Sequence, residues 1–424
     1  MPQIEALEAT DHDARDLEAL AARAKLEPLG LGQAPDDAAL DEAAMELRRR
    51  WLAAAHGPAD TTLKSPCDGA STRLPHGETV RFGYERELDA SVLETRGRAG
   101  EDDFLTPAGW RATRVVCRSG QAALSCLLHL VTSLNGKAGA LGVHHAGRYF
   151  ETRALLGLWP RHTLRTLPAT EPAVDLLVAE PVFCDGAFGI TDPTVLPRAR
   201  RALLLDTTLV GAKVDLAPWF ARVDGPMVAV FRSGLKLDQA GLELANVGII
   251  YLFIREGCDG DSVAEALRRV RALTGSGLTL DEMAALSAPW FLDAGYLRRY
   301  AEKVFANNVA LAHAIGDNSA VFEAGCHPVL FRNDAVAPFC AIRPRGGDLG
   351  AHRKILAKVE HEIERRELRV TRGGSFGFRG PRYEPIEPAP EEGRPFLRVA
   401  MGFRSSAATQ GLIDILQEMA AGSP

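Results

Sequence analysis

Short hydrophobic runs alternate with helical or loop segments along the middle of the chain. They cover residues 138–143, 175–181, 202–206 and 227–231. Runs of this length that are apolar at successive positions are typical of strands buried on both faces of a mostly parallel sheet. Intervening helices, such as the one expected at Ala122–Leu134, are typical of a doubly wound α/β domain. We therefore predict a large α/β domain over residues 106–262.

Different patterns flank this domain on both sides. Helical segments dominate from Ser262 to Leu273 and from Leu280 to Ile315, and strand-like pieces with two further helices follow, which predicts a smaller α+β domain over residues 263–424. Residues 1–60 are rich in Ala, Leu, Glu and Arg and have helical periodicity near 14–24 and 38–56. We expect a helical N-terminal extension there. The polar residues 61–105 predict an extended arm.

Composition excludes several classes of protein. Hydrophobic residues make up 46% and charged residues 25% of the chain, which is the balance of a soluble globular protein. A formal net charge of −6 provides no broad basic face, so we expect no nucleic-acid partner. The seven cysteines lack metal-ligand spacing, which argues against a metal site and favours a reducing compartment. The chain shows no signal peptide and no membrane-spanning run, so we expect a cytoplasmic protein without a membrane partner.

One lysine follows a buried strand closely. Lys236 ends the segment Ser233-Gly234-Leu235-Lys236, which comes directly after the run 227–231. A buried lysine is costly unless it is used, and a desolvated amine is a nucleophile whose main covalent use is a Schiff base. Ser233 is placed to hydrogen-bond a phosphate beside that amine. An ordinary loop lysine at a strand end explains the segment equally well.

Two other segments end or begin an expected element with a polar residue. Asp206 ends the run 202–206, so its carboxylate would point from the carboxyl edge of the sheet, where ligands bind in open α/β folds. Ser119 is a good N-cap for the following helix, and the N–H groups of Gly120 and Gln121 would form an anion site. Capping alone also explains both Asp206 and Ser119.

The C-terminal part has two candidates for contact with a substrate. Arg398 lies inside an apolar strand-like segment, where a guanidinium requires a carboxylate partner. An amino-acid substrate would supply one, and an internal acid is an equally good alternative. Ser375 lies in a loop after Gly373 and Gly374 that would border the same pocket, although a plain surface turn also explains it.

In this order, the segments resemble those of the fold-type I enzymes that depend on pyridoxal 5′-phosphate (PLP). The resemblance is to the Cys/Met-metabolism branch, which holds cystathionine synthases and lyases and methionine γ-lyase, and it runs from about residue 80 to 424. Three segments have a direct counterpart: Phe82-Gly83-Tyr84-Glu85-Arg86 is similar to the Tyr-x-Arg arm, Ser119-Gly120-Gln121-Ala122-Ala123 to Ser-Gly-Met-Ala-Ala, and Asp206-Thr207-Thr208 to Asp-Asn-Thr. The other matching segments are Tyr149-Phe150-Glu151-Thr152, Ser233-Gly234-Leu235-Lys236 and Arg398-Val399-Ala400-Met401-Gly402.

The resemblance implies a role for each matching residue. Lys236 would carry PLP as a Schiff base, Asp206 would pair with the pyridine nitrogen, and Tyr149 would stack on the ring. Ser119, Gly120, Gln121 and Ser233 would hold the cofactor phosphate, together with Tyr84 and Arg86 of a neighbouring subunit. Thr208 is a further residue expected to bind the cofactor. The resemblance therefore implies a homo-oligomer, either a dimer or a dimer of dimers.

The chain also departs from this branch. Glu180-Pro181-Val182-Phe183-Cys184 stands where the branch has Glu-x-Pro-x-Asn, so Cys184 or Asp185 takes the place of an Asn that contacts the cofactor. Arg404 stands where the branch has an acid, and the extension over residues 1–60 is additional. These changes retain the cofactor residues and alter the substrate side, which indicates a divergent member.

The resemblance implies an enzyme that acts on an amino acid through an external aldimine and a Cα carbanion. Lys236 would be the general base, Tyr84 would assist as acid or base, and Arg398 and Ser375 would bind the substrate. We expect β/γ-elimination or substitution at a C–S or C–O bond, as in a lyase or transferase of specialised biosynthesis. An aminotransferase is the alternative, because it shares every cofactor residue except Tyr84 and Arg86. The remaining alternative is a non-enzymatic binding module in which Lys236 has a structural role.

Overall fold

The computed structural model describes most of the chain. Described residues are 2–32, 35–60, 62, 71–75, 77–81, 83–97, 104–136, 139–317, 319–388 and 394–422. Parts of the expected arm over residues 61–105 therefore lie outside the described residues, as does Phe82 beside the Tyr84/Arg86 motif.

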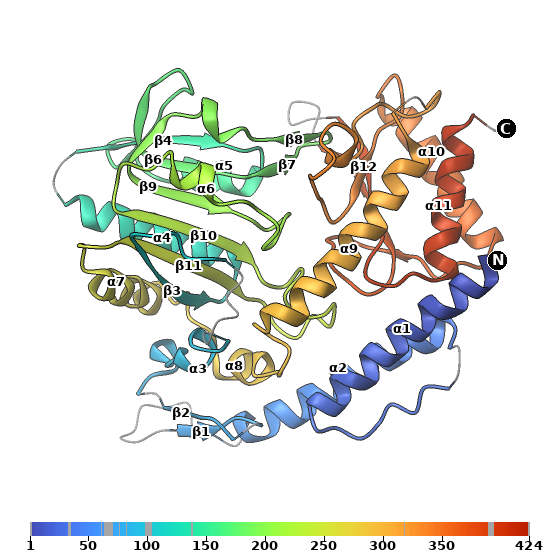
Figure 1. Ribbon diagram of the computed structural model, residues 1–424, viewed down its shortest axis with the longest axis horizontal. Helices are drawn as coiled ribbons and strands as arrows, with labels where there is room; N and C mark the ends of the chain where they lie inside the picture. The colour runs from blue at the N-terminus through green and yellow to red at the C-terminus, as the bar shows by residue number, and fades with distance from the viewer. Residues whose placement is uncertain are drawn as a thin grey trace.

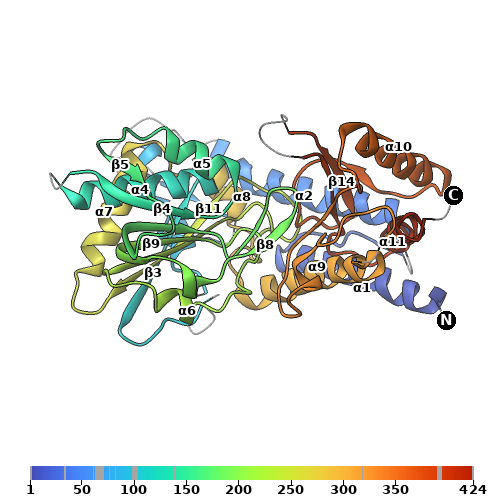
Figure 2. The same cartoon turned by 90° about the horizontal axis from the view of Figure 1, so that it is seen from above.

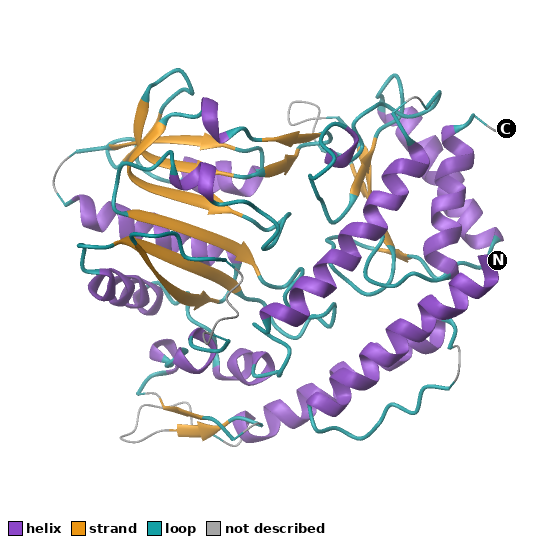
Figure 3. Ribbon diagram, in the orientation of Figure 1, coloured by secondary structure: helices purple, strands orange, loops and turns teal. Residues whose placement is uncertain are grey.

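A seven-stranded sheet forms the centre of the larger domain (Figures 1 and 3). Its strands, in spatial order, are β3 (Trp110–Cys117), β11 (Gly248–Arg255), β10 (Met227–Ser233), β9 (Arg198–Asp206), β6 (Ala173–Ala179), β4 (Leu141–Ala146) and β5 (Leu164–Thr166). Strand β11 is antiparallel to both of its neighbours, and the other pairs are parallel. The sheet is thus mostly parallel, as the sequence predicts.

Both faces of this sheet are covered, which is why its strands are apolar at successive positions. Along β9, Leu204 packs with helix α4 (Gly120–Asn135), and helix α7 (Gly260–Leu273) contributes to the same cluster. Leu203 and Leu205 point to the opposite face and belong to a cluster that contains α6 (Ala217–Phe220) and α8 (Leu280–Leu286). Alternation across a strand thus buries every position of the run.

The smaller domain is built on a second sheet (Figure 2). Its strand order is β12 (Cys340–Ile342), β15 (Phe396–Ala400), β14 (Arg382–Ile386) and β13 (Thr371–Arg372). Leu397 and Val399 of β15 pack with helices α9 (Ala294–Ile315), α10 (Leu349–Arg365) and α11 (Ala407–Ala420). Phe396 and Ala400, on the other face, pack with β7 (Val182–Cys184) and β8 (Phe188–Ile190). Residues of β15 at even positions therefore face the larger domain.

The N-terminal extension consists of two helices that lie along both domains (Figure 1). Helix α1 (Pro2–Arg23) and helix α2 (Asp37–Asp60) contact one another, and α2 also packs on α8. Trp51 of α2 is fully buried, with its ring centroid 5.8 Å from that of Trp290, and its indole N–H donates to the Ala285 carbonyl at 2.8 Å. The extension is therefore part of the hydrophobic core.

Some element boundaries differ from the sequence prediction. Helix α1 begins at Pro2, earlier than the expected residue 14, because residues 2–13 are mostly good helix formers without a clear apolar stripe. The helical segments expected over Leu280–Ile315 are present, with a break between α8 and α9 that the sequence analysis did not locate. Pro289 cannot continue a helix there, and Leu292 has a φ of +62°.

The arm, where it is described, contains short elements rather than one extended stretch. They are β1 (Ser71–Arg73), β2 (Thr79–Arg81), the 3₁₀ turn η1 (Glu85–Glu87) and α3 (Ser91–Glu94), with further 3₁₀ turns elsewhere in the chain at η2 (Pro193–Val195) and η3 (Pro328–Leu330).

Across the described parts of the chain, each helix is too short or too polar to cross a membrane.

Replacing Trp51 tests whether the extension contributes to the core. We expect Trp51→Ala to lower the free energy of unfolding by about 3–5 kcal/mol, because it leaves a large cavity and removes the hydrogen bond from the indole to the Ala285 carbonyl. Urea denaturation followed by circular dichroism measures this. Met45→Ala on the same helix is the matched control: Met45 is 62% exposed, so its loss should change stability by less than about 0.5 kcal/mol. Equal losses in the two variants would contradict the packing described.

Candidate active site at the carboxyl edge of the large sheet

The parallel strands β3, β10, β9, β6 and β4 end at one edge of the large sheet, and the predicted site residues follow several of them. The register pairs Gly248 at the start of β11 with both Cys117 of β3 and Ser233 of β10, and it pairs Asp206 of β9 with Phe231. Strands β6 and β4 end beside β9 with Ala179 and Ala146 in register. Residues after these ends thus converge, as expected for the ligand edge of an open α/β sheet.

The first turn of α4 contacts the end of β10. Ser119 caps the helix by accepting the Ala122 N–H at 3.0 Å, so the capping interpretation holds. A Cβ on Gly120 would lie 3.2 Å from the Cβ and backbone nitrogen of Ser233, so only glycine allows so close an approach without displacement. The Ser233 N–H in turn donates to Thr208 Oγ1 at 3.1 Å. Three segments that are distant in sequence therefore meet at a helix N-terminus, whose dipole favours an anion.

Lys236 lies in the turn after β10 and is only partly accessible to solvent. Its amine donates to Ser375 Oγ and lies 5.3 Å from the centroid of the Phe376 ring. Burial lowers the pKa of Lys236, and the charge of Arg398 lowers it further. Ser375 has a φ of +71°, a conformation that is strained for a residue with a side chain. Ser375, for which the sequence left both a pocket-bordering loop and a plain turn open, is thus a direct neighbour of Lys236.

Asp206 is a buried carboxylate without an ion-pair partner among the described residues. It accepts the Thr208 N–H at 2.8 Å. Burial raises the pKa of Asp206 to about 6, and the nearby negative charge of Glu180 also raises it. A cation beside Asp206 would lower this pKa again, so the site is suited to a positively charged ring nitrogen.

Glu180, which follows β6, holds the segment that carries Tyr149. Its Oε1 atom lies 3.1 Å from Nε2 of His145 and accepts the Tyr149 N–H at 3.1 Å. A Cβ on Gly147 would lie 2.3 Å from the same oxygen, so a larger residue at this position would displace the Glu180 carboxylate. The Tyr149 hydroxyl donates to Glu151 at 2.7 Å, and burial raises its pKa well above the ordinary value. Glu180 thereby fixes the start of α5 (Phe150–Gly157), where Tyr149 is the N-cap residue.

Arg398 has an internal carboxylate partner, which is one of the two alternatives that the sequence left open. It faces Glu384 in the register of β14 and β15, and its Nη1 atom donates to that carboxylate at 2.7 Å. Its buried Nε atom has no hydrogen-bond partner among the described residues. Arg398 shares the face of β15 that points to the larger domain, and its charge acts on both Lys236 and Tyr149. One edge of the guanidinium is therefore still available to a carboxylate.

Of the two residues expected to replace the family Asn, Cys184 is the better placed. Burial raises the pKa of Cys184 to about 12, and Arg398 is near enough to oppose this shift. Asp185 instead pairs with Arg148 at 3.4 Å on the partly exposed side of the hairpin.

Tyr84 and Arg86 are not brought to Lys236 within this chain. Tyr84 is 47% exposed, and the Arg86 guanidinium lies 4.8 Å from its ring centroid. Glu85, between them, accepts the Leu280 N–H at 3.1 Å and ties the turn to α8. Their predicted contact with a neighbouring subunit's cofactor stays a prediction.

The residues present fit PLP. A helix N-terminus beside Ser233 and Thr208 suits a phosphate, and an unpaired, partly buried carboxylate suits a pyridinium. The partly desolvated amine of Lys236 follows the end of the neighbouring strand. The unpartnered Nε of Arg398 suits a carboxylate group. Among the described residues there is no group of three or more His, Cys, Asp or Glu side chains that could hold a metal ion.

Comparison with solved structures identifies the fold. The chain aligns with an apo structure described as a methionine gamma lyase from Micromonospora echinospora, at 18% identity and a TM-score of 0.52 over 89% of this chain and 98% of that one. It aligns with a cystathionine gamma synthase from Xanthomonas oryzae pv. oryzae, in complex with aminoacrylate and cysteine, at 16% identity and a TM-score of 0.55 over 89% and 98% of the two chains. It also aligns with a cystathionine gamma lyase from Micromonospora echinospora, at 18% identity and a TM-score of 0.54 over 89% of this chain and 99% of that one.

The chain has the fold of these lyases and synthases. The fold-type I architecture predicted from the sequence is therefore confirmed. No protein-family model matches the chain, and no curated protein sequence matches it significantly. The low identity agrees with a divergent sequence, and the likeness concerns the fold.

Sequence reasoning missed three residues that shape this site. Glu384 was missed because its pairing with Arg398 depends on the register of two strands. His145 carries no signal of its own in the sequence, although its position one residue before the end of β4 places it at the carboxyl edge. Glu180 was noted only as part of a motif, and its contacts with residues 145–149 arise from neighbouring strands.

The raised pKa of Asp206 predicts a pH dependence of stability in the cofactor-free protein. Between pH 3.8 and about 6 the folded state retains a proton on Asp206 that the unfolded state has lost, so stability falls as pH rises through this range. Relative to Asp206→Asn, the free energy of unfolding of wild type should fall by up to roughly 3 kcal/mol between pH 4 and pH 7. Urea denaturation of both proteins at several pH values from 4 to 7 measures the difference. A difference independent of pH would contradict the buried, unpaired carboxylate.

Proposed function

We propose that this protein is a PLP-dependent enzyme that eliminates or substitutes a group on the β or γ carbon of an amino acid. The observation that carries the proposal is the position of Lys236. Its partly desolvated amine lies at the carboxyl edge of the sheet, beside Ser375 and within range of the charge of Arg398. A lowered pKa leaves a larger fraction of the amine neutral, which is the form that attacks a carbonyl carbon or accepts a proton.

Each of the surrounding residues has a task in this scheme. The first turn of α4, with Ser233 and Thr208, holds the phosphate, and Asp206 keeps the pyridine nitrogen protonated. When bound, PLP supplies the electron sink for negative charge that develops at the substrate Cα. Lys236 would hold the cofactor, and its amine would act as the general base that removes the Cα proton of the substrate.

Arg398 orients the substrate in this proposal. A carboxylate bound to its free Nε edge would fix the amino acid, while Glu384 holds the Nη1 side of the guanidinium. Tyr149 would cover the ring from the start of α5. The Cα–H bond would then be held toward Lys236, whose amine would take the proton. The leaving group would depart with its bonding electrons from the β carbon, or from the γ carbon after a Cβ proton is also removed. Water would then hydrolyse the unsaturated product of an elimination, or a second nucleophile would add to it in a substitution. Tyr84 and Arg86 would complete the site from a second subunit.

Substitution of Lys236 tests the cofactor assignment. Wild type purified with PLP should absorb visible light, and borohydride reduction should add the mass of the reduced cofactor to the peptide that contains Lys236. Lys236→Ala should lose both signals, because no other amine occupies its position. Lys213→Ala is the matched control, since Lys213 is an exposed lysine in an ion pair with Glu302 at 3.4 Å. Wild type without visible absorbance would contradict the assignment and favour a binding module.

A panel of amino acids with β or γ leaving groups tests the reaction and the role of Arg398. We expect release of the leaving group for at least one of them, and Arg398→Gln should raise KM roughly 10- to 100-fold, the equivalent of a charged hydrogen bond. Arg394→Gln is the control, because Arg394 precedes the same strand and pairs with Glu323 away from Lys236. Steady-state kinetics and mass spectrometry of products provide the readout. Formation of a keto acid with pyridoxamine phosphate, and no released group, would identify an aminotransferase instead.

A further inference from the structure

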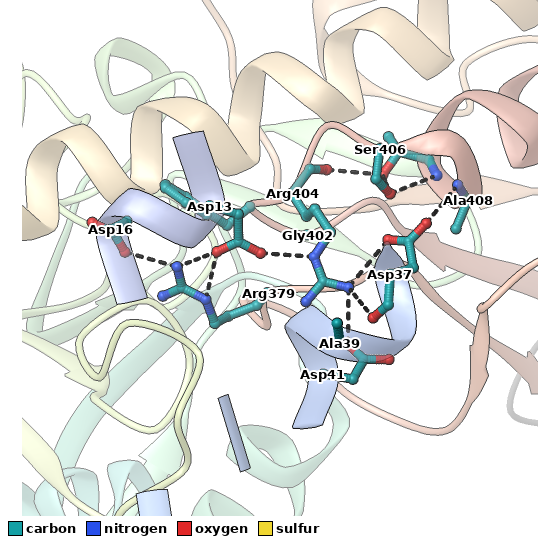
Figure 4. A network of polar contacts seen from close by, with 12 residues as sticks. Asp13, Asp16, Asp37, Ala39, Asp41, Arg379, Gly402, Arg404, Ser406 and Ala408 are labelled. Carbon is teal, nitrogen blue, oxygen red and sulfur yellow. Dashed lines mark hydrogen bonds and ion pairs between the residues drawn. The ribbon is translucent and has the colours of Figure 1, made fainter. Parts of the chain in front are cut away.

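Helix α1 places a carboxylate inside the C-terminal domain. Asp13 is 1% exposed and lies between two buried guanidinium groups, as Figure 4 shows. Its Oδ1 atom accepts from Nε of Arg379 at 2.9 Å, and its Oδ2 atom accepts from Nε of Arg404 at 2.7 Å. Asp16, one turn along, accepts from Nη2 of Arg379 at 2.7 Å. Two arginines of the C-terminal domain are thus neutralised by the extension.

Helix α2 supplies the remaining partners of Arg404. Asp37 and Asp41 accept from its Nη1 atom at 3.2 Å and 2.9 Å (Figure 4). The two arginines therefore differ in their partners on the extension: Arg379 depends on α1 alone, whereas Arg404 is also held by α2. Arg404 stands where the related branch has an acid, and the aspartates of the additional helices compensate for this change of charge.

These charges are retained although they are buried. Burial by itself lowers the pKa of Arg379, but Asp13 and Asp16 outweigh it and hold the pKa above its ordinary value. Burial likewise raises the pKa of Asp13, and the two arginines reverse that shift. Because a buried charge that loses its partner is strongly destabilising, the network fixes the relative positions of its members.

Arg379 also holds the turn that follows Lys236. Its Nη1 atom donates to the Ala240 carbonyl at 3.1 Å. That turn is unusual, because Ala240 and Glu243 have φ values of +54° and +47°. A Cβ on Gly241 would lie 2.8 Å from both Cγ and the backbone nitrogen of Arg379, so the turn and Arg379 are in direct contact.

Arg379 ends the short segment that contacts Lys236 itself. Ser375, at the start of this segment, accepts the hydrogen bond from the Lys236 amine. A Cβ on Gly377 would lie 2.4 Å from the Lys236 carbonyl oxygen, so backbone meets backbone there. Tyr300 of α9 donates to the Gly377 carbonyl at 3.0 Å. Residues 375–379 therefore hold Lys236 at both its amine and its main chain.

We propose that Arg379 is a positioning residue through which Asp13 and Asp16 of helix α1 hold residues 375–379 and the turn after Lys236 around the Lys236 amine. The extension is then part of the site's framework. The meaning for catalysis rests on the proposed function, since Lys236 matters most if it bears the cofactor. The contacts, however, predict a property of Lys236 that is measurable without any cofactor.

That property is the pH at which the Lys236 amine loses its proton. The charged groups that act on it are Arg398 of β15, Glu384 of β14, Glu151 of α5 and Glu243 of the following turn. The aspartates of the extension are not among these groups. A change in Lys236 on altering Asp13 or Asp16 would therefore arise from a shift of the 375–379 segment and entry of water, and would raise the pKa toward its ordinary value.

A matched set of variants separates this role from general stabilisation. Asp16→Asn weakens the hold on Arg379, while Asp41→Asn removes an equal charge from Arg404. Asp13→Asn combined with Asp16→Asn removes both carboxylates of Arg379. Each cofactor-free protein is labelled by reductive methylation at a series of pH values, and mass spectrometry of the Lys236 peptide gives the midpoint. Hydrogen exchange of residues 236–245 and 373–380 is measured on the same samples.

We expect the midpoint of Lys236 to rise by about one pH unit in the double variant and by about half a unit in Asp16→Asn. Asp41→Asn should leave it within about 0.2 units of wild type. Exchange in both segments should become faster in the first two proteins and stay unchanged in the third. An unchanged midpoint in the folded double variant would overturn the proposal. If the double variant does not fold, equal midpoints in Asp16→Asn and Asp41→Asn would overturn it.

The two proposals fail in different ways. If Lys236 does not bind PLP, wild type shows no visible absorbance, yet the midpoints of the cofactor-free proteins still test the positioning role. If Arg379 has no positioning role, the midpoints agree while the visible absorbance of wild type is retained.

Discussion

The desolvation of one lysine amine is the constraint around which the rest of the site is arranged. Water is removed from Lys236 by the end of the large sheet on one side and by Phe376 and Ser375 of the smaller domain on the other. An amine in such a place would be destabilising in a protein that did not use it. The same burial makes the amine more nucleophilic, so the energetic cost and the proposed chemistry have one cause.

Closure of the two sheets on each other produces this environment. Strand β15 alternates between the helices of its own domain and the β7–β8 hairpin of the larger domain, so Arg398 is carried to the side where Lys236 lies. Glu384 is opposite Arg398 in the ladder and occupies one side of the guanidinium, which leaves the buried Nε atom without a hydrogen-bond partner among the described residues. A cross-strand pair of this kind orients an anchor without neutralising its whole hydrogen-bonding edge.

The N-terminal helices neutralise buried positive charges of the C-terminal domain. Arg379 and Arg404 are buried in the C-terminal domain, and α1 and α2 deliver the aspartates that pair with them. Buried ion pairs add little net stability compared with apolar packing, but they require a specific geometry of the charged groups. Hydrophobic contacts such as Trp51 with Trp290 attach the extension, and the ion pairs then determine where it lies relative to residues 375–379.

The fold class and most of the site were predictable from the order of the residues. Wholly apolar runs indicated a sheet covered on both faces, and a polar residue at the end of a run marked the carboxyl edge; Asp206 and Lys236 were found in this way. Such signals are local, because strand periodicity and helix capping are written over a few consecutive residues. Only the tertiary structure decided that Glu384 pairs with Arg398, that Ser375 touches Lys236, and that Asp13 reaches Arg379. These pairs join residues 14, 139 and 366 positions apart, and their contacts depend on strand register, domain closure and helix docking, which no local pattern encodes.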